Sequence, residues 1–178
     1  MKTLKGTKTE QNLMEAFIGE SKARNKYTYF ASKAKKEGYI QISKIFEETS
    51  DNEKEHAKIW FKLIDKIGTT EENLKTSIET EGYEARTMYP EFAKIAKEEG
   101  FDDISKLFVE VAEVEAEHEK RYKKLLLNIE NDKVFVSDKE TEWVCLNCGY
   151  VHKGKTAPKT CPACSHEQEY FARHTENY

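Results

Sequence analysis

The sequence predicts a mainly α-helical protein, a four-helix bundle followed by a small β domain built on metal-binding knuckles. Apolar residues recur at helical spacing before about residue 130, a long segment of that region is repeated, and all four cysteines lie near the C-terminus. Near residue 130 a Gly-poor, Pro-poor composition gives way to β-prone residues with Gly and Pro. We therefore expect a helical domain at 1–134 and a β domain at 135–178.

The helical region contains one hairpin twice. The segment AKKEGYIQISKIFEETSDNEKEHAK (34–58) matches AKEEGFDDISKLFVEVAEVEAEHEK (96–120) at a constant offset of 62 residues. Gly38 and Gly100 occupy the same place in each copy and are expected to end a helix in the left-handed conformation. The apolar spacing predicts helices at about 8–36, 40–67, 72–98 and 102–129. Neither hairpin can bury its apolar stripe alone, so the pair predicts a bundle.

Acidic and histidine side chains interrupt every apolar stripe at nearly the same distance from the turns. In the last helix, Glu115 and His118 fall between Val111 and Tyr122. Carboxylates buried at one level would be strongly destabilising without a counter-charge, which a pair of divalent ions supplies. The candidate ligands are Glu20, Glu53, His56, Glu81, Glu84, Glu115 and His118.

Two repeated Glu-x-x-His pairs strengthen this interpretation, because residues three apart share a helix face. Four carboxylates and two imidazoles would neutralise two divalent ions, and mixed oxygen and nitrogen ligands favour iron or manganese over zinc. A single such pair would be weak, since charge runs are usually solvated; Glu55, Glu117 and Glu119 are expected on such a solvated face. Glu84 is a fifth carboxylate that neutrality does not require. Tyr27 and Tyr89 are either ordinary core tyrosines or hydrogen-bond partners of the ligands.

The C-terminal domain has two C-x-x-C pairs, Cys145 with Cys148 and Cys161 with Cys164. Two such pairs can close a tetrahedron of thiolates around zinc or iron. When the two C-x-x-C pairs are considered alone, zinc is the commoner metal. A redox-active metal pair nearby favours a one-electron iron carrier, because the pair needs a source of electrons. The histidines at 152, 166 and 174 are expected at the surface.

The composition of the chain argues against two kinds of binding partner, nucleic acid and membrane. The net charge of −4 is spread over 29 basic and 33 acidic residues, with no basic footprint for nucleic acid. No apolar run approaches the roughly 18 residues of a membrane span, and no apolar signal segment opens the chain. We expect a cytoplasmic protein that contacts neither membrane nor nucleic acid.

The ordered motifs GESKARNKY, NEKEH, MYPEFAKIAKEEG, EAEHEKR, CLNCGY and CPAC resemble rubrerythrins along the whole chain. The resemblance implies a ferritin-like bundle with a non-haem di-iron site, oxo- or hydroxo-bridged when oxidised, followed by a rubredoxin-like four-thiolate iron domain, where zinc can enter recombinant protein. It implies reduction of hydrogen peroxide to water, with electrons from rubredoxin or an NAD(P)H-dependent reductase. All seven candidate ligands match the family pattern. Glu53 and Glu115 would bridge the irons, and His56 would replace Glu84 on one iron upon reduction.

The short segment KIGTTEEN between the hairpins raises a question of assembly. Ferritin-like bundles run the second and third helices parallel, so the connection must cross the bundle. Five extended residues reach about 18 Å, whereas a 27-residue helix is about 40 Å long. We therefore expect a homodimer that exchanges hairpins, unless the third helix starts late, near Ile78.

The sequence is compatible with three functions, each typical of a different class of protein. The first is a peroxide-reducing enzyme. The second is a ferroxidase or iron-handling protein without peroxidase turnover. The third is a zinc-ribbon interaction protein whose bundle metals are structural. The fifth carboxylate favours the first, because an extra ligand suits a site that rearranges.

Overall fold

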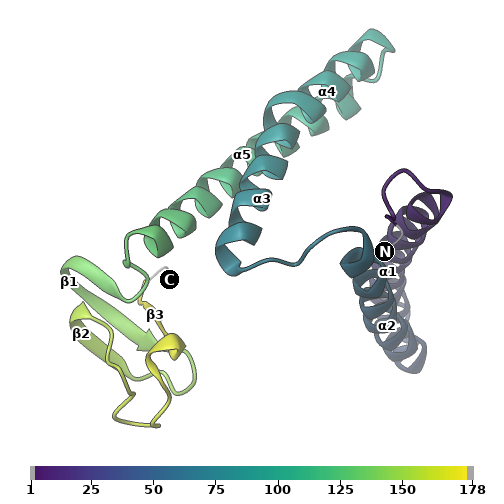
Figure 1. Cartoon of the computed structure of the whole chain (residues 1–178). Helices are drawn as coiled ribbons and strands as arrows, with labels where there is room; N and C mark the ends of the chain where they lie inside the picture. The colour runs from purple at the N-terminus through teal and green to yellow at the C-terminus, as the bar shows by residue number, and fades with distance from the viewer. Residues whose placement is uncertain (1–2, 176–178) are drawn as a thin grey trace. The chain divides into compact units, whose positions relative to one another are not determined.

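A computed structural model describes residues 3–175, which fold as two compact units that divide between residues 67 and 68. Each unit is described by itself. The chain is mainly α-helical and ends in a small three-stranded sheet (Figure 1).

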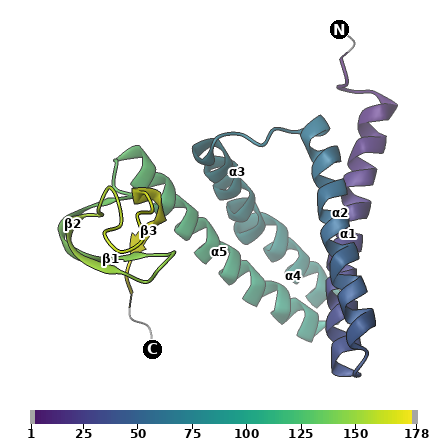
Figure 2. The ribbon, with the colours of Figure 1, turned by 90° about the horizontal axis from the view of Figure 1, so that it is seen from below.

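The first unit is a hairpin of two long helices, α1 (Lys8–Lys36) and α2 (Ile40–Ile64) (Figure 2). Thr7 caps α1 by accepting a hydrogen bond from the Glu10 amide. Gly38, at φ +86°, ends α1 in the left-handed conformation, and the Tyr39 amide reaches back to the Ala34 carbonyl. The buried Ser43 hydroxyl then donates to the Ala31 carbonyl at 2.8 Å and ties the two helices together near the turn.

The second unit begins with a hairpin of the same design. One arm consists of α3 (Thr70–Tyr83), the π-helical turn η1 (Glu84–Met88) and α4 (Tyr89–Glu98), and it packs along α5 (Asp102–Glu130). Gly100 has φ +85°, and the Ser105 hydroxyl donates to the Ala93 carbonyl at 2.7 Å. The two hairpin turns are therefore stabilised by equivalent hydrogen bonds, made by residues 62 positions apart in the sequence.

The π turn explains an irregularity in the repeat. Beyond η1 the offset is 62, which carries Arg24 to Arg86, but Glu20 corresponds to Glu81 at an offset of 61. A π turn accommodates one residue more than an α turn. The one-residue insertion thus lies within the turn Glu84–Met88, and such bulges are frequent at functional sites.

The C-terminal segment is a three-stranded antiparallel sheet in the order β2-β1-β3, with β1 (Val136–Cys145), β2 (Val151–Thr156) and β3 (Phe171–Arg173). A short 3-10 helix, η2 (Gln168–Tyr170), precedes β3. Its core is small and contains two of the cysteines: Trp143, Cys145, Ala157, Cys161 and Phe171, all at most 4 % exposed. Two metal-ligating side chains thus lie in the interior of this domain.

The predicted helices agree with the structure apart from three details. The second helix ends at Ile64 rather than 67, and the third starts at Thr70 rather than 72. A capping box between Thr69 and Glu72 sets that start. The third helix is also interrupted by η1. Within the described part of the chain, no helix is both long enough and apolar enough to span a bilayer.

Candidate metal centres

The first hairpin brings three of the predicted ligands together on one face. Glu20 of α1 and Glu53 and His56 of α2 offer ligand atoms that all lie within 4.8 Å of one another. His56 Nδ1 is 2.7 Å from Glu53 Oε2, as expected for residues one turn apart. The Glu53 side chain is 18 % exposed and the His56 side chain 52 % exposed, so the group lies at an open edge of this hairpin.

The second hairpin forms the matching group from Glu81 of α3 and from Glu115 and His118 of α5, again within 4.8 Å. His118 Nδ1 is 2.6 Å from Glu115 Oε2 and 3.4 Å from Glu81 Oε2. One oxygen from each carboxylate and one ring nitrogen therefore face a common point. This donor set fits a divalent transition metal.

The electrostatics of the second group, Glu81, Glu115 and His118, favour a bound cation. Burial raises the pKa of Glu81, and the adjacent Glu115 carboxylate raises it further, against the opposing effect of His118. Two carboxylates in contact cannot both ionise at low cost unless a positive charge lies between them. A divalent ion supplies that charge.

Glu84, the seventh predicted ligand, lies outside both groups of three. It begins the π turn and is half-buried. Burial raises the pKa of the Tyr89 hydroxyl, as do the charges of Glu84, Glu115 and Glu81, in that order. Tyr89 therefore lies in the field of three candidate ligands.

Tyr27 and Tyr89 are also centres of two matching aromatic clusters. Tyr27 contacts Phe30 and Phe46 with ring centroids 6.4 and 6.0 Å apart. Tyr89 contacts Phe92 and Phe108 at the same two distances. Both tyrosines are half-buried in these aromatic clusters.

Glu119 contradicts the sequence-based expectation. Glu55 and Glu117 are solvent-exposed as predicted, with side chains 57 % and 67 % exposed. Glu119 is only 7 % exposed, because Arg86 and Lys123 surround its carboxylate at 2.7 and 2.9 Å. Hydrogen bonds from these two cations lower the pKa of Glu119 to about 2. Sequence reasoning grouped it with solvated charges and missed the partner 33 residues away.

A break in the repeat could have marked this cluster. Glu119 corresponds to Ala57 at an offset of 62, and Gly82 corresponds to Ser21 at the offset of 61 that holds before the π turn. A new acid and a new glycine appear together in the second copy. A paired change of this kind indicates a contact that the first copy lacks.

The four cysteines converge as predicted. Sγ of Cys145 is 3.7 Å from Sγ of Cys164, and Sγ of Cys148 is 3.7 Å from Sγ of Cys161. Thiolates arranged tetrahedrally about 2.3 Å from a metal would be about 3.8 Å apart, whereas a disulfide bond is about 2.05 Å long. The geometry fits one tetrahedral metal ion and excludes disulfides.

Each C-x-x-C pair has the same knuckle geometry. The Gly149 and Ser165 amides donate to the carbonyls of Cys145 and Cys161 at 2.8 and 2.9 Å, and both residues have positive φ angles, +79° and +60°. The His166 amide, directed at Cys164, lowers the pKa of that thiol to about 6. Contact with the Cys164 thiol and burial instead raise the pKa of Cys148 to about 12, so a metal cation is needed to hold all four sulfurs as thiolates.

The half-buried side chains of His152, His166 and His174 lie outside the cysteine group. His166 stacks on Tyr170 with ring centroids 4.4 Å apart, and His174 Nδ1 is 3.1 Å from Glu142 Oε2. None of the three joins the thiolates as a ligand in the described chain.

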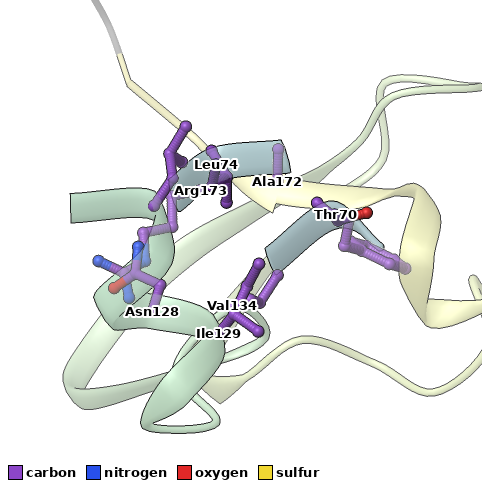
Figure 3. A pocket seen from close by; sticks show the side chains of 9 residues that line it. Thr70, Leu74, Asn128, Ile129, Val134, Ala172 and Arg173 are labelled. Atoms are coloured by element: carbon purple, nitrogen blue, oxygen red, sulfur yellow. The ribbon is translucent and has the colours of Figure 1, made fainter. Parts of the chain in front are cut away.

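A separate apolar pocket of about 430 Å³ lies where the start of α3 and the end of α5 meet β3 (Figure 3). Leu74 and Leu125 contribute to its lining, together with Ile129 and Val134. Leu74 is two helical turns before Glu81 on the same face of α3. The apolar stripe that carries the ligands thus continues uncovered to this end of the hairpin.

A helical scaffold with paired carboxylate–histidine groups, joined to a four-thiolate knuckle domain, defines the class of di-metal carboxylate proteins with an attached iron–sulfur module. The rubrerythrin family model matches residues 11–126, and the model of the rubrerythrin rubredoxin-like domain matches residues 143–172. The chain belongs to the rubrerythrin family.

Curated relatives match nearly the whole chain. Rubrerythrin-1 of Clostridium acetobutylicum is 50 % identical, and the alignment covers 100 % of both chains. The rubrerythrin of Porphyromonas gingivalis is 48 % identical, covering 99 % of this chain and 95 % of that protein. The rubrerythrin of Nitratidesulfovibrio vulgaris is 46 % identical, with 96 % of each covered. The protein is accordingly an iron-dependent oxidoreductase that has the ligand groups for a di-iron site and a rubredoxin-like iron site.

Proposed function

We propose that the protein is a hydrogen peroxide reductase that protects the cell from oxidative stress. The observation that carries this proposal is the duplicated carboxylate–histidine group together with a four-thiolate module on the same chain. The first suits a pair of redox-active metals, and the second suits a one-electron carrier that could re-reduce them.

The ligand assignment follows the two groups. Glu20, Glu53 and His56 would hold one side of the di-iron site, and Glu81, Glu115 and His118 the other. Four carboxylates would offset the charge of two ferrous ions, and each imidazole is held one turn from its carboxylate. Glu53 and Glu115, matching positions of the repeat, would bridge the pair. Glu84 would be the exchangeable ligand, which His56 replaces on reduction.

When bound, a ferrous pair supplies the two electrons that cleave the oxygen–oxygen bond of hydrogen peroxide. The chain's own part is to fix the donor atoms. In the second hairpin His118 Nδ1 lies 2.6 Å from Glu115 Oε2, so one metal ion can contact both atoms. Tyr89, beside three carboxylates, would hydrogen-bond to one of them from outside the ligand set, and Tyr27 would do the same in the first hairpin.

Electrons would reach the di-iron site through the iron held by Cys145, Cys148, Cys161 and Cys164. Cys148 is exposed, which gives a donor access to one thiolate. The donor would be rubredoxin, an NAD(P)H-dependent reductase or both, and the protein would work in the cytoplasm, where such donors are supplied. The functional modules would divide at 134/135, between the end of α5 at Glu130 and the start of β1 at Val136.

We further propose a homodimer with exchanged hairpins. Five residues, 65–69, separate α2 from α3, and they reach about 18 Å when extended. The 25 residues of α2 span about 37 Å, so a parallel α3 of the same chain is out of reach. The start of α3 at Thr70 supports this proposal, because a direct crossing within one chain would need a late start near Ile78.

Anaerobic peroxide titration tests the function. The iron-loaded, fully reduced protein should consume about 1.5 hydrogen peroxide per di-iron site, one for the ferrous pair and half for the four-thiolate iron, whose bands are bleached by reductant and restored by peroxide. With a reductase and NADH present, turnover should continue until the peroxide is exhausted. Oxidation of ferrous iron without any continued consumption of NADH would identify a ferroxidase instead, and a colourless protein holding only zinc from iron-replete cells would identify an interaction protein.

A further inference from the structure

A part-buried ion pair between Arg86 and Glu119 adjoins the second ligand group. Arg86 donates two parallel hydrogen bonds to Glu119, Nη1 to Oε2 at 2.7 Å and Nη2 to Oε1 at 2.9 Å. Lys123 Nζ lies 2.9 Å from the same Oε1. Glu119 is the one buried acid among the described residues. Two-point pairing between a guanidinium and a carboxylate fixes orientation as well as distance.

Gly82 leaves the room that this pair occupies. A Cβ at position 82 would lie 2.5 Å from Glu119 Oε1 and in collision with Arg86 Nη2. Gly82 is buried in the last turn of α3 and has ordinary helical geometry. Glycine is therefore needed at position 82 because it leaves room for the ion pair, and not because the backbone adopts an unusual conformation.

The three residues of this cluster adjoin candidate ligands on three segments. Gly82 follows Glu81 on α3, and Glu119 follows His118 on α5. Arg86 lies two residues after Glu84, within the π turn. The ion pair thus connects the π turn to the segment of α5 that carries Glu115 and His118.

The first hairpin shows what the fold does without this pair. Arg24 corresponds to Arg86, but its guanidinium reaches only the neighbouring Asn25 Oδ1, at 3.4 Å. The position of Glu119 is taken by Ala57, and α1 runs as an unbroken α-helix. A regular hairpin of this design therefore forms without the ion pair. The pair occurs in the second hairpin, which also has the π turn and the extra carboxylate of Glu84.

We propose that Arg86 and Glu119 are positioning residues for the metal site. Their two-point ion pair, seated against Gly82, holds the π turn in register with α5, so that Glu84 and Glu81 are presented to the metal pair together with Glu115 and His118. This inference rests on the proposed ligand assignment. Neither side chain binds the metal itself.

The test uses the full chain with zinc in the four-thiolate site and the bundle stripped of metal, titrated with Co²⁺ as the probe. Arg86→Lys keeps the charge but loses the two-point geometry, and Glu119→Gln removes the carboxylate. Arg24→Lys is the matched control in the other hairpin. Lys123→Gln is a second control, because it removes a cation from Glu119 without touching the π turn. The measurements are Co²⁺ affinity, the visible Co²⁺ spectrum and the Tm of the metal-free protein.

The wild type and both controls should bind a pair of Co²⁺ ions with the same spectrum. Arg86→Lys and Glu119→Gln should bind one of the two about 10- to 100-fold more weakly, the usual loss when an outer partner of a metal ligand is removed, with a changed Co²⁺ band. Since the Arg86 side chain is 64 % exposed, Arg86→Lys should fold even if Glu119→Gln does not.

Two results would overturn the inference in distinguishable ways. If Arg86→Lys lowers only the Tm and leaves Co²⁺ affinity and spectrum like those of Arg24→Lys, the pair is structural and the ligand assignment stands. If the wild-type bundle binds no pair of Co²⁺ ions, the proposed function itself fails and the inference fails with it.

Discussion

Glu119 illustrates how one residue can carry a role that its sequence neighbourhood hides. It stands in the charged run EAEHEKR, where Glu117 is exposed and pairs with Lys120 at 3.0 Å. Two positions later the helix has turned by about 200°, and the side chain is covered by Arg86 and Lys123. Burial of an acid with both cations in place makes it sensitive to change, because removal of one partner leaves the other uncompensated.

Glu119→Gln should destabilise the metal-free protein at neutral pH but not in strong acid. The pKa of Glu119 is lowered from 4.5 to about 2 in the folded protein, so its stabilising effect is complete above the unfolded pKa and is lost as the pH falls towards 2. The free energy of unfolding of wild type and variant should differ by a constant amount above about pH 5 and converge below it. Urea unfolding at several pH values measures this. A difference that is independent of pH down to pH 3 would show that the carboxylate charge is not responsible.

Cys161→Ser should separate the two redox steps. Cys161 is 1 % exposed within the thiolate group, and its loss opens the four-sulfur site that is proposed to carry electrons. Reductant-driven turnover of hydrogen peroxide should disappear, while one two-electron oxidation of chemically reduced protein remains. Stopped-flow spectroscopy with and without the reductase measures both steps.

Cys148→Ser repeats the previous test at an exposed position, which guards against simple misfolding of the small domain. Normal steady-state turnover in both variants would mean that electrons bypass this module.

At the scale of elements, the π turn distinguishes two otherwise equivalent hairpins. Deletion of the exposed residue Thr87 should convert η1 into a regular α turn. The residues of α3 would then rotate by about 100° relative to α4, which turns Glu81 away from His118 and separates Arg86 from Glu119. Iron content, measured on the full chain, should fall from about three to about two irons per chain because one ligand group is dismantled. The control Thr87→Ala keeps the chain length and should retain all three irons; full iron content in the deletion variant would contradict this role of the turn.

The serine links at the hairpin turns are expected to be equivalent. Ser43 and Ser105 are buried and donate to carbonyls of the preceding helix at 2.8 and 2.7 Å. Each substitution to alanine should lower the free energy of unfolding by about 1 kcal/mol, and the double variant by about their sum. Denaturant unfolding of the three variants checks this. Strong non-additivity would show that the two hairpins respond to each other's turns.

The elements show where sequence reasoning succeeds and where it stops. Apolar spacing and the repeat predicted all four helical arms, and the fixed i, i+3 geometry predicted that Glu53 with His56, and Glu115 with His118, would face together. Both are local properties of a helix. The π turn and the Arg86–Glu119 pair depend on contacts between segments far apart in the chain, which periodicity does not encode. The one-residue mismatch between Glu20 and Gly82 was visible in the sequence, but only the structure identified its cause.

At the scale of the whole molecule, the two hairpins are complementary in charge. Residues 1–67 carry a net charge of +4 and residues 68–134 a net charge of −7. Opposite charges favour contact between unlike hairpins and disfavour contact between like ones. Each hairpin also leaves large apolar side chains uncovered, among them Ile45 and Leu63 in the first and Leu107 and Leu125 in the second. Both features support a bundle assembled from one hairpin of each kind.

Complementation tests whether the hairpins come from different chains. One variant carries Glu53→Ala with His56→Ala, and the other carries Glu115→Ala with His118→Ala. In an exchanged dimer, a mixed pair joins the intact first hairpin of one chain to the intact second hairpin of the other and restores one complete site. Co-expressed and differently tagged chains should therefore regain about a quarter of wild-type peroxidase activity, from the roughly half of random dimers that are mixed. No recovery in purified mixed dimers would show that each chain closes its own bundle.

The inserted residue of η1 also bears on the ancestry of the chain. Its two halves share turns, serine links and aromatic clusters, as expected for copies of one ancestral segment. Recombination that replaced the later half with the earlier one would still encode a well-formed hairpin, but without the bulge, the additional acid at 84 or the gap at Gly82. The halves have therefore ceased to be interchangeable, and the extra codon of η1 is one of the changes that ended their symmetry.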